Sequence, residues 1–294
     1  MDAAAGAEHR LALLEAELAS VKAEFDDLNL LYQATIEHGE AVEDQLAEAN
    51  LALQTTQKRL SEELTEAVNY IFSILPEPRK AAPRTDWLLV PSTELGGDSF
   101  GYHEIDADHM AFYLLDVCGH GVGAALLSVT AINVLRSAAL PNTDFRDPGA
   151  VLSALNDAFP MERQNNMYFT IWYGVYDRRT RELAWAGGGH PPAFLRRGGE
   201  LRKLDSTTFM IGVVDEYDAP TMRTTLEPGD RLYIFSDGVF ELHMQDGGIW
   251  GLDRLEELMR ADARGSMLDL VVRETTRVTL EGRGVAATDI PADT

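Results

Sequence analysis

Three aspartates that stand beside glycines at the ends of apolar runs are the residues of this sequence best suited to chemistry. Asp98 lies in LGGDSFG, Asp116 ends the apolar run that begins at Ala111, and Asp237 follows RLYIFS and precedes Gly238. An aspartate at the end of a buried strand costs free energy unless a positive group meets it. A glycine nearby lets the backbone approach a ligand closely. Because carboxylates that converge from separate strand ends repel one another, either their pKa values rise or a cation holds them.

The chemistry that these aspartates indicate is the binding of a hard divalent cation. Mg²⁺ and Mn²⁺ prefer oxygen ligands and keep several waters, so a few carboxylates suffice. Zinc is less favoured, because the sequence has one cysteine, Cys118, and no HExxH pattern. Each aspartate alone also suits a structural role, Asp116 as a cap of the helix that follows and Asp237 in an Asp-Gly turn. The three together favour the metal site.

The glycines after Asp116 also match a dinucleotide-binding pattern, which we weigh as an alternative. The run from Gly119 to Ala124 reads GHGVGA and follows a predicted strand. Asp116 would then lie close to the pyrophosphate and repel it. The pattern also requires a strand that ends in an acid ~20 residues further on, where this sequence has the loop-like PNTDFRDP. Both features argue against a dinucleotide site.

The composition of the whole chain limits its class and its partners. The chain has 294 residues, and its net charge is −23, from 48 acidic and 25 basic side chains. Such a surface repels nucleic acid and anionic membranes, so we expect neither as a direct partner. One cysteine excludes an internal disulfide, and no apolar run reaches the ~18 residues of a membrane helix. The start, MDAAAGAEHRLALLE, is not typical of a secretory signal. These features predict a soluble, cytoplasmic protein.

Residues 1–75 are predicted to form one long helix that pairs with a second copy as a left-handed coiled coil. A 3-4 spacing holds over seven heptads, with Leu11, Leu18, Phe25, Tyr32, Gly39, Leu46, Leu53 and Leu60 in one position and Leu14, Val21, Leu28, Thr35, Val42, Ala49 and Thr56 in the other. Thr35, Gly39 and Thr56 weaken this seam. The alternative is a single amphipathic helix that packs on its own globular domain. Prolines at 76, 78 and 83 predict an extended linker over residues 76–86.

The chain from residue 87 to 294 alternates short strands with helices, which predicts an α+β domain. Strand character is present in WLLVPS, HMAFYLLDV, YFTIWYGVYD, ELAWAG, PAFLRR and RLYIFSD. Helices are expected at 123–139, 148–159, 252–261 and 267–281. The short polar turns YDRRTRE and RRGGE favour antiparallel hairpins over regular βαβ units.

Four motifs in order resemble the metal-dependent serine/threonine phosphatases of the PPM superfamily, in their bacterial SpoIIE-like branch. The motifs are ELGGDSFG, LLDVCGHGVGAALLSV, AGGGHPPAFL and LYIFSDGVFE, and the resemblance runs from about residue 74 to the C-terminus. It implies a β-sandwich of two antiparallel sheets flanked by helices, with two Mg²⁺ or Mn²⁺ ions at one edge. Asp98, Asp116, Asp237 and the backbone carbonyl of Val117 match the family's metal ligands.

The C-terminus departs from the family pattern, which has an acidic pair and a final core strand. The chain here ends GVAATDIPADT. Asp293 best matches the first acid of that pair, with Asp289 as the fallback, and the last strand is expected to be missing. Cys118 is interpreted as a small buried residue. His120 lies four residues after Asp116, whereas eukaryotic relatives place their general-acid histidine two residues after it, so that role is not transferred and His120 is interpreted as hydrogen-bonding to backbone near the start of a helix. The role of His190 stays open between stabilising a turn and contacting substrate.

The resemblance predicts a protein phosphatase whose substrate is a phosphorylated partner protein. Within the family's pathways, that partner is an anti-sigma-factor antagonist of the STAS type, and the coiled coil transmits a regulatory signal through its weak seam. The alternative is a catalytically impaired, phosphatase-like domain that serves as a dimeric scaffold or a partner-binding switch, which the unusual C-terminus motivates.

Overall fold

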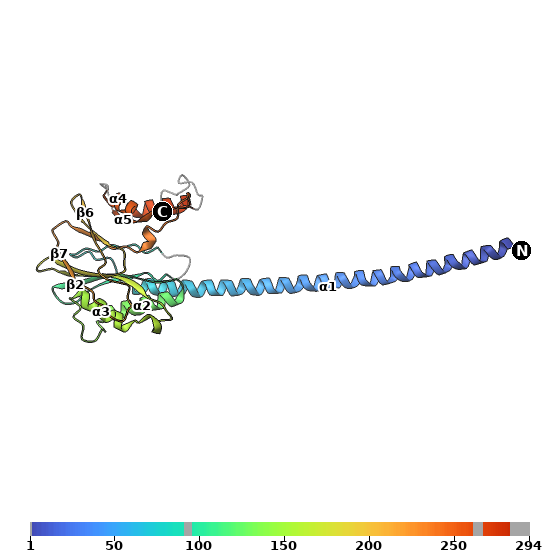
Figure 1. The fold of residues 1–294 in the computed structure, drawn as a ribbon, viewed down its shortest axis with the longest axis horizontal. Coiled ribbons are helices and arrows are strands. Elements are labelled where there is room, and N and C mark those ends of the chain that lie inside the picture. The colour runs from blue at the N-terminus through green and yellow to red at the C-terminus, as the bar shows by residue number, and fades with distance from the viewer. Residues whose placement is uncertain (1, 91–95, 261–266, 283–294) are drawn as a thin grey trace. The chain divides into compact units, whose positions relative to one another are not determined.

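The computed structural model describes residues 2–90, 96–260 and 267–282. The chain divides into two compact units, Met1–Ala67 and Val68–Thr294. The first unit belongs to one helix, and the second contains both sheets and the other helices (Figure 1). None of the helices in the described part of the chain combines the length and the apolar character that crossing a lipid bilayer requires.

Helix α1 (Asp2–Ile74) is continuous, and the prediction of one long N-terminal helix is confirmed. The hydroxyls of Thr35 and Thr56 donate to carbonyl oxygens one turn earlier, so neither threonine interrupts the helix. Large apolar side chains of the heptad positions are exposed, for example Leu18 at 70% and Leu28 at 63%. An exposed apolar stripe of this length has the pattern of a coiled-coil seam.

The proline-rich segment after α1 is a closed loop within the second unit rather than the extended linker that was predicted. The backbones of Arg79 and Thr85 exchange hydrogen bonds of 3.1 Å in both directions. Trp87 donates from Nε1 to the carbonyl of Pro76, and its ring lies 4.9 Å from that of Phe100. The prediction of a strand at WLLVPS is wrong for residues 87–90, whose backbone is irregular. The rest of that stretch lies outside the described residues.

The described residues form two antiparallel sheets, as predicted. The larger has the order β1-β2-β3-β4-β7 and the smaller the order β6-β5-β8. Their bounds are β1 Ser99–Glu104, β2 His109–Val117, β3 Phe169–Asp177, β4 Glu182–Gly188, β5 Ala193–Arg197, β6 Glu200–Leu204, β7 Met222–Thr225 and β8 Arg231–Tyr233. The two polar turns predicted from YDRRTRE and RRGGE join β3 to β4 and β5 to β6. Strands β1, β6 and β7 were not predicted, and β8 ends four residues earlier than expected.

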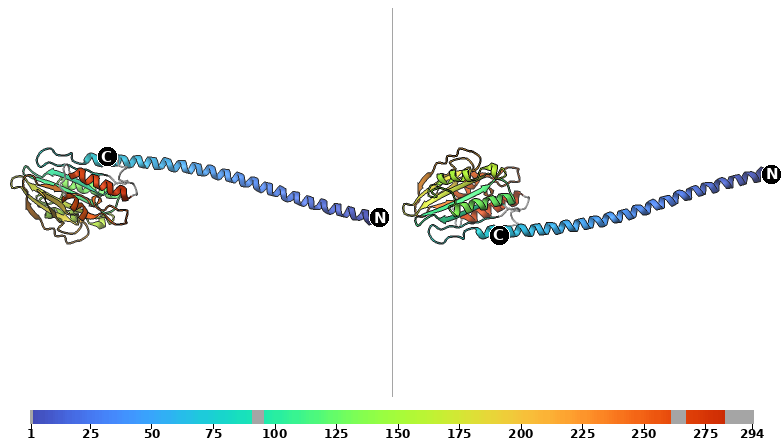
Figure 2. Two further views of the ribbon diagram at one scale, coloured as in Figure 1. Left: turned by 90° about the horizontal axis from the view of Figure 1, so that it is seen from above. Right: turned by 90° about the horizontal axis from the view of Figure 1, so that it is seen from below.

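The helices of the second unit cover the outer faces of the two sheets (Figures 1 and 2). Helices α2 (Val122–Arg136) and α3 (Pro148–Ala158) pack on the larger sheet, while α4 (Gly251–Arg260) packs on β6 and against α5 (Met267–Gly282). Two short 3₁₀ helices, η1 (Met161–Arg163) and η2 (Asp237–Val239), lie in connections. All four α-helices were predicted to within a few residues at each end.

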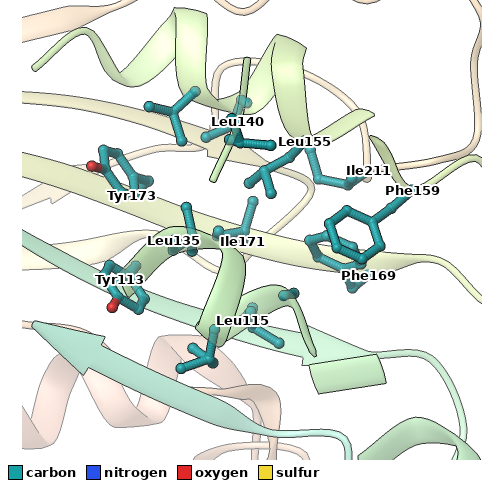
Figure 3. Packing of buried hydrophobic residues seen from close by; sticks show 14 of the residues in the cluster. Tyr113, Leu115, Leu135, Leu140, Leu155, Phe159, Phe169, Ile171, Tyr173 and Ile211 are labelled. Carbon is teal, nitrogen blue, oxygen red and sulfur yellow. The ribbon is translucent and has the colours of Figure 1, made fainter. Parts of the chain in front are cut away.

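Alternation along the strands divides the apolar side chains between two layers. On β2 and β3, side chains such as Tyr113, Leu115 and Ile171 face α2 and α3 in the main core (Figure 3). The opposite face of the larger sheet presents Trp172 and Leu183, which cluster with residues of the smaller sheet such as Leu195. Because successive side chains point to opposite faces, the residues between those of the main core face the smaller sheet.

Candidate metal site

Asp98 and Asp116 lie side by side at one end of the larger sheet. Asp116 is the second-last residue of β2, and Asp98 directly precedes β1. The antiparallel register pairs Ser99 with Leu115, and the Val117 N–H donates to the Gly97 carbonyl at 3.4 Å, so the pairing continues through both aspartates. Opposed residues of antiparallel strands project from the same face. The two carboxylates therefore share the face directed at the smaller sheet.

Gly97 is required by the close approach of its backbone to β2. A Cβ atom at this position would lie 2.4 Å from the carbonyl oxygen of Val117. Real side chains do not tolerate such a distance, so any other residue would displace this carbonyl or the chain before Asp98. The family resemblance implies a ligand role for that same carbonyl, which belongs to the residue directly after Asp116.

Asp237 reaches the site from the smaller sheet. The chain leaves β8 at Tyr233, and Ser236 donates from Oγ to Oδ2 of Asp98 at 2.8 Å. Asp237 then begins η2, and its carbonyl accepts the N–H groups of Phe240 and Glu241 at 2.9 and 2.8 Å. The structure thus brings together the three aspartates that the sequence singled out, from three separate segments.

The electrostatics of the site show that it concentrates negative charge. Burial, then the charges of Asp98 and Asp237, raises the pKa of Asp116 from 3.8 to about 7. Burial also raises the pKa of Asp98, against the opposing effect of the hydrogen bond from Ser236. Oδ1 of Asp98 is buried and has no hydrogen-bond partner among the described residues. A buried carboxylate oxygen without a partner is unfavourable, and a cation would remove both this cost and the repulsion.

This donor set fits a hard divalent ion. Carboxylate and carbonyl oxygens are the ligands of Mg²⁺ and Mn²⁺, and Mg²⁺ usually takes one or two carboxylates and completes its shell with water. Within the described ranges, no three His, Cys, Asp or Glu side chains are already arranged to hold one ion. Water and the Val117 carbonyl would therefore have to supply further ligands.

Two residues near the site were missed by the sequence analysis. The charge of Glu241 contributes to the raised pKa of Asp116. Its signal was its place four residues after Asp237 in SDGVFE, one helical turn away. Thr170 of β3 lies directly opposite Asp116, and its Oγ1 is buried without a partner in the described structure. Nothing in the sequence marks Thr170, because strand pairing alone places it there.

The remaining predicted residues lie elsewhere or are undescribed. Asp293 and Asp289 fall outside the described residues. His120 is exposed between β2 and α2. His190 is buried in the turn between β4 and β5, where burial lowers its pKa to about 4 and Nδ1 lies 2.9 Å from the carbonyl of Pro191. Cys118 is half-buried, and its Sγ accepts the N–H of Tyr168 at 3.2 Å.

Comparison with solved structures identifies the fold. The SiaA-PP2C domain of Pseudomonas aeruginosa matches with a TM-score of 0.62 and 24% identity, over 78% of this chain and 92% of that one. The PP2C phosphatase domain of SpoIIE from Bacillus subtilis, with a fragment of its regulatory domain, matches with a TM-score of 0.55 and 22% identity, over 64% of this chain and 55% of that one. The fold is that of the PP2C phosphatase domains.

Sequence relatives place the chain within that class. The profile of the Stage II sporulation protein E (SpoIIE) family matches residues 106–290, so the chain belongs to this family and is a PP2C-type serine/threonine phosphatase. Phosphoserine phosphatase RsbU of Bacillus subtilis is 26% identical over 81% of this chain and 70% of its own length. Stage II sporulation protein E of the same organism is 24% identical over 62% of this chain but only 22% of its own length. The resemblance read from the four motifs is confirmed.

Proposed function

We propose that this chain hydrolyses phosphoserine or phosphothreonine on a partner protein, with Asp98, Asp116 and Asp237 holding two divalent ions. The observation that carries the proposal is the pairing of Asp98 with Asp116 across β1 and β2, with one buried oxygen unpartnered. Mn²⁺ or Mg²⁺ ions bound here would lower the pKa of a shared water and offset the charge on the phosphoryl oxygens.

The residues of the chain have distinct roles in this proposal. Asp116 lies between its neighbours on β1 and β3, so it is the carboxylate best placed to contact both ions. Ser236 fixes the orientation of Asp98 through its hydrogen bond of 2.8 Å. Asp237 and the carbonyl of Val117 complete the oxygen donors. Water attacks phosphorus directly in this scheme, so Cys118 is not needed as a nucleophile. A fourth carboxylate from Asp293 stays a prediction.

The proposed substrate is a phosphorylated STAS-type anti-sigma-factor antagonist in a partner-switching pathway of the cytoplasm. The support is the similarity to RsbU and to RsbP of Bacillus subtilis, both named phosphoserine phosphatases; RsbP is 26% identical over 51% of this chain and 38% of its own length. The net charge of −23 favours a protein partner over nucleic acid.

We also propose that α1 pairs with a second copy and regulates the phosphatase domain. The support is the exposed apolar stripe of residues 11–60. Gly39 interrupts the stripe, and a Cβ there would meet no atom within 4 Å. Gly39→Leu should therefore strengthen the dimer in sedimentation equilibrium and change the phosphatase rate. If it changes neither, the regulatory role has no support.

The function is tested by hydrolysis of p-nitrophenyl phosphate and of a phosphoserine peptide with EDTA, Mg²⁺ or Mn²⁺. We expect turnover that depends on the metal and falls by at least ~100-fold in Asp116→Ala and Asp237→Ala. Asp108→Ala is the matched control, because Asp108 is an exposed aspartate at the other end of β2. Full activity in either site variant would exclude the proposed site.

The second candidate function is a non-catalytic scaffold. The observation that favours it is that no three acidic or histidine side chains of the described ranges are arranged around one ion. Titration of the full chain with Mn²⁺ in a calorimeter separates the two functions. Uptake of two ions supports the enzyme, whereas absence of uptake together with absence of turnover supports the scaffold.

A further inference from the structure

Three polar side chains lie in a row across one face of the larger sheet. Asp98 stands beside Asp116 across β1 and β2, and the β2–β3 register pairs Asp116 directly with Thr170. Opposed residues of antiparallel strands have Cβ atoms ~4.5–5.5 Å apart on the same face. The hydroxyl of Thr170 therefore borders the carboxylate of Asp116 on the side away from Asp98.

The hydroxyl of Thr170 is not explained by the packing of β3. Its Oγ1 is buried and has no hydrogen-bond partner among the described residues. The next residue on the same face, Trp172, is fully buried in an apolar cluster. Valine has nearly the same shape as threonine and would avoid the cost of an unpartnered hydroxyl. Departures of this kind from local preference are expected at functional sites.

Both ends of the row carry an unpartnered oxygen. Oδ1 of Asp98 and Oγ1 of Thr170 are both buried without partners in the described structure, and Asp116 lies between them. Because β1 and β3 lie two strand spacings apart, ~9–10 Å, no single atom reaches both oxygens, but a divalent ion with its bound waters beside Asp116 spans that separation. A hydroxyl can donate to a phosphoryl oxygen or accept from a coordinated water. Either a phosphoryl oxygen or a metal-bound water would therefore serve as the partner of the Thr170 hydroxyl.

We propose that Thr170 is a positioning residue whose hydroxyl hydrogen-bonds to an oxygen that the site acquires together with its divalent ion. The proposal rests on the proposed function and extends the site to β3. The oxygen belongs either to water on the ion or to the phosphoryl group. In both cases the hydroxyl holds that oxygen against Asp116, and it contributes nothing to the stability of the metal-free protein.

The test compares Thr170→Val, which removes the hydroxyl at nearly constant shape, with Thr170→Ser, which keeps it. Without metal, Thr170→Val should melt at the same temperature as wild type or higher. With Mn²⁺ alone, calorimetry should show binding weakened by about 3- to 10-fold in Thr170→Val, the size of one hydrogen bond, and largely restored in Thr170→Ser. If the partner is a phosphoryl oxygen, the loss appears instead in the affinity for inorganic phosphate at saturating Mn²⁺.

A control and the contradicting outcomes keep the inference separate from the proposed function. Thr207 accepts the N–H of Gly187 through Oγ1 at 3.3 Å, so Thr207→Val should lower the metal-free melting temperature. A similar fall in Thr170→Val would show that its hydroxyl stabilises the fold and would overturn the inference. Unchanged affinity for both Mn²⁺ and phosphate in Thr170→Val would overturn it as well. If wild type itself takes up no Mn²⁺, the proposed function fails first.

Discussion

Ser236 donates a hydrogen bond of 2.8 Å to Asp98, a residue 138 positions earlier in the chain. This contact joins the segment that follows β8 of the smaller sheet to the start of β1 in the larger one. It therefore connects the two halves of the sandwich at the point where the three aspartates meet. Each half supplies acidic groups, so the relative position of the sheets decides the geometry of the site.

Removal of this hydrogen bond should weaken metal binding most at low pH. The Ser236 hydroxyl lowers the pKa of Asp98 against the effect of burial. In Ser236→Ala the pKa of Asp98 rises further, so a proton competes better with the ion. We expect Mn²⁺ affinity to fall about 10-fold at pH 6 and less at pH 8, since a hydrogen bond to a charged group is worth ~1.5–3 kcal/mol. Calorimetric titrations at both pH values measure this, and an equal loss at both would contradict the protonation argument.

Neutralising Asp116 should stabilise the metal-free protein while abolishing its response to metal. The pKa of Asp116 is raised to about 7 in the folded protein. Stability from this group is therefore full below the ordinary pKa of 3.8, decreases as the pH rises above that value, and is lost once the pH passes about 7. Asp116→Asn removes that loss and should be more stable than wild type at pH 8 by ~1–2 kcal/mol, after allowance for solvent screening, with less than half of that advantage at pH 5.

Asp116→Asn should also lose the gain in stability that wild type obtains from bound metal. Excess Mn²⁺ at 100 times its dissociation constant should stabilise wild type by ~2.7 kcal/mol and leave Asp116→Asn unchanged. Urea unfolding at pH 5 and 8, with Mn²⁺ or EDTA, measures all these differences. A variant less stable than metal-free wild type at pH 8 would show that the charge of Asp116 is compensated within the protein.

Adjacent glycines should respond very differently to the same substitution. A Cβ on Gly97 would lie 2.4 Å from the Val117 carbonyl oxygen, whereas on Gly96 the nearest atom is 3.9 Å away. Gly97→Ala should cost ~1–3 kcal/mol of stability and weaken Mn²⁺ binding, because the backbone of β2 must move. Gly96→Ala, the matched control, should change stability by no more than ~0.5 kcal/mol. Similar melting temperatures for the two variants would contradict this account.

The sequence was sufficient for the elements whose patterns are strong. The apolar runs of β2 and β3 and the periodic helices α2 and α3 were predicted close to their observed bounds. Strand β7 was missed because MRTT is short, polar and largely exposed, and its pairing with β4 defines it. The run that starts at Trp87 resembled a strand because it is apolar, but Trp87 instead packs on Phe100.

Only those site residues that are marked by their neighbours in the sequence could be predicted. Asp98, Asp116 and Asp237 were recognisable because glycines and apolar runs surround them. Thr170 has no such signal, since its role depends on which residue of β3 lies opposite Asp116. Register is set by packing across the whole sheet, and a shift of one residue would direct Phe169 or Ile171 to this position instead.

The buried His190 should make the protein less stable in acid. Burial lowers its pKa to about 4, so the folded protein keeps it neutral while the unfolded chain binds a proton below about pH 6.5. Its contribution is therefore present at neutral pH and is lost as the pH falls from about 6.5 to 4. The full loss is on the order of 3 kcal/mol.

His190→Gln should flatten the slope of unfolding free energy against pH over this range. His38→Gln, at an exposed position of α1, should keep the wild-type slope. Urea titrations at half-unit steps from pH 4.5 to 7 provide the slopes. An unchanged slope in His190→Gln would mean that another group carries the acid sensitivity.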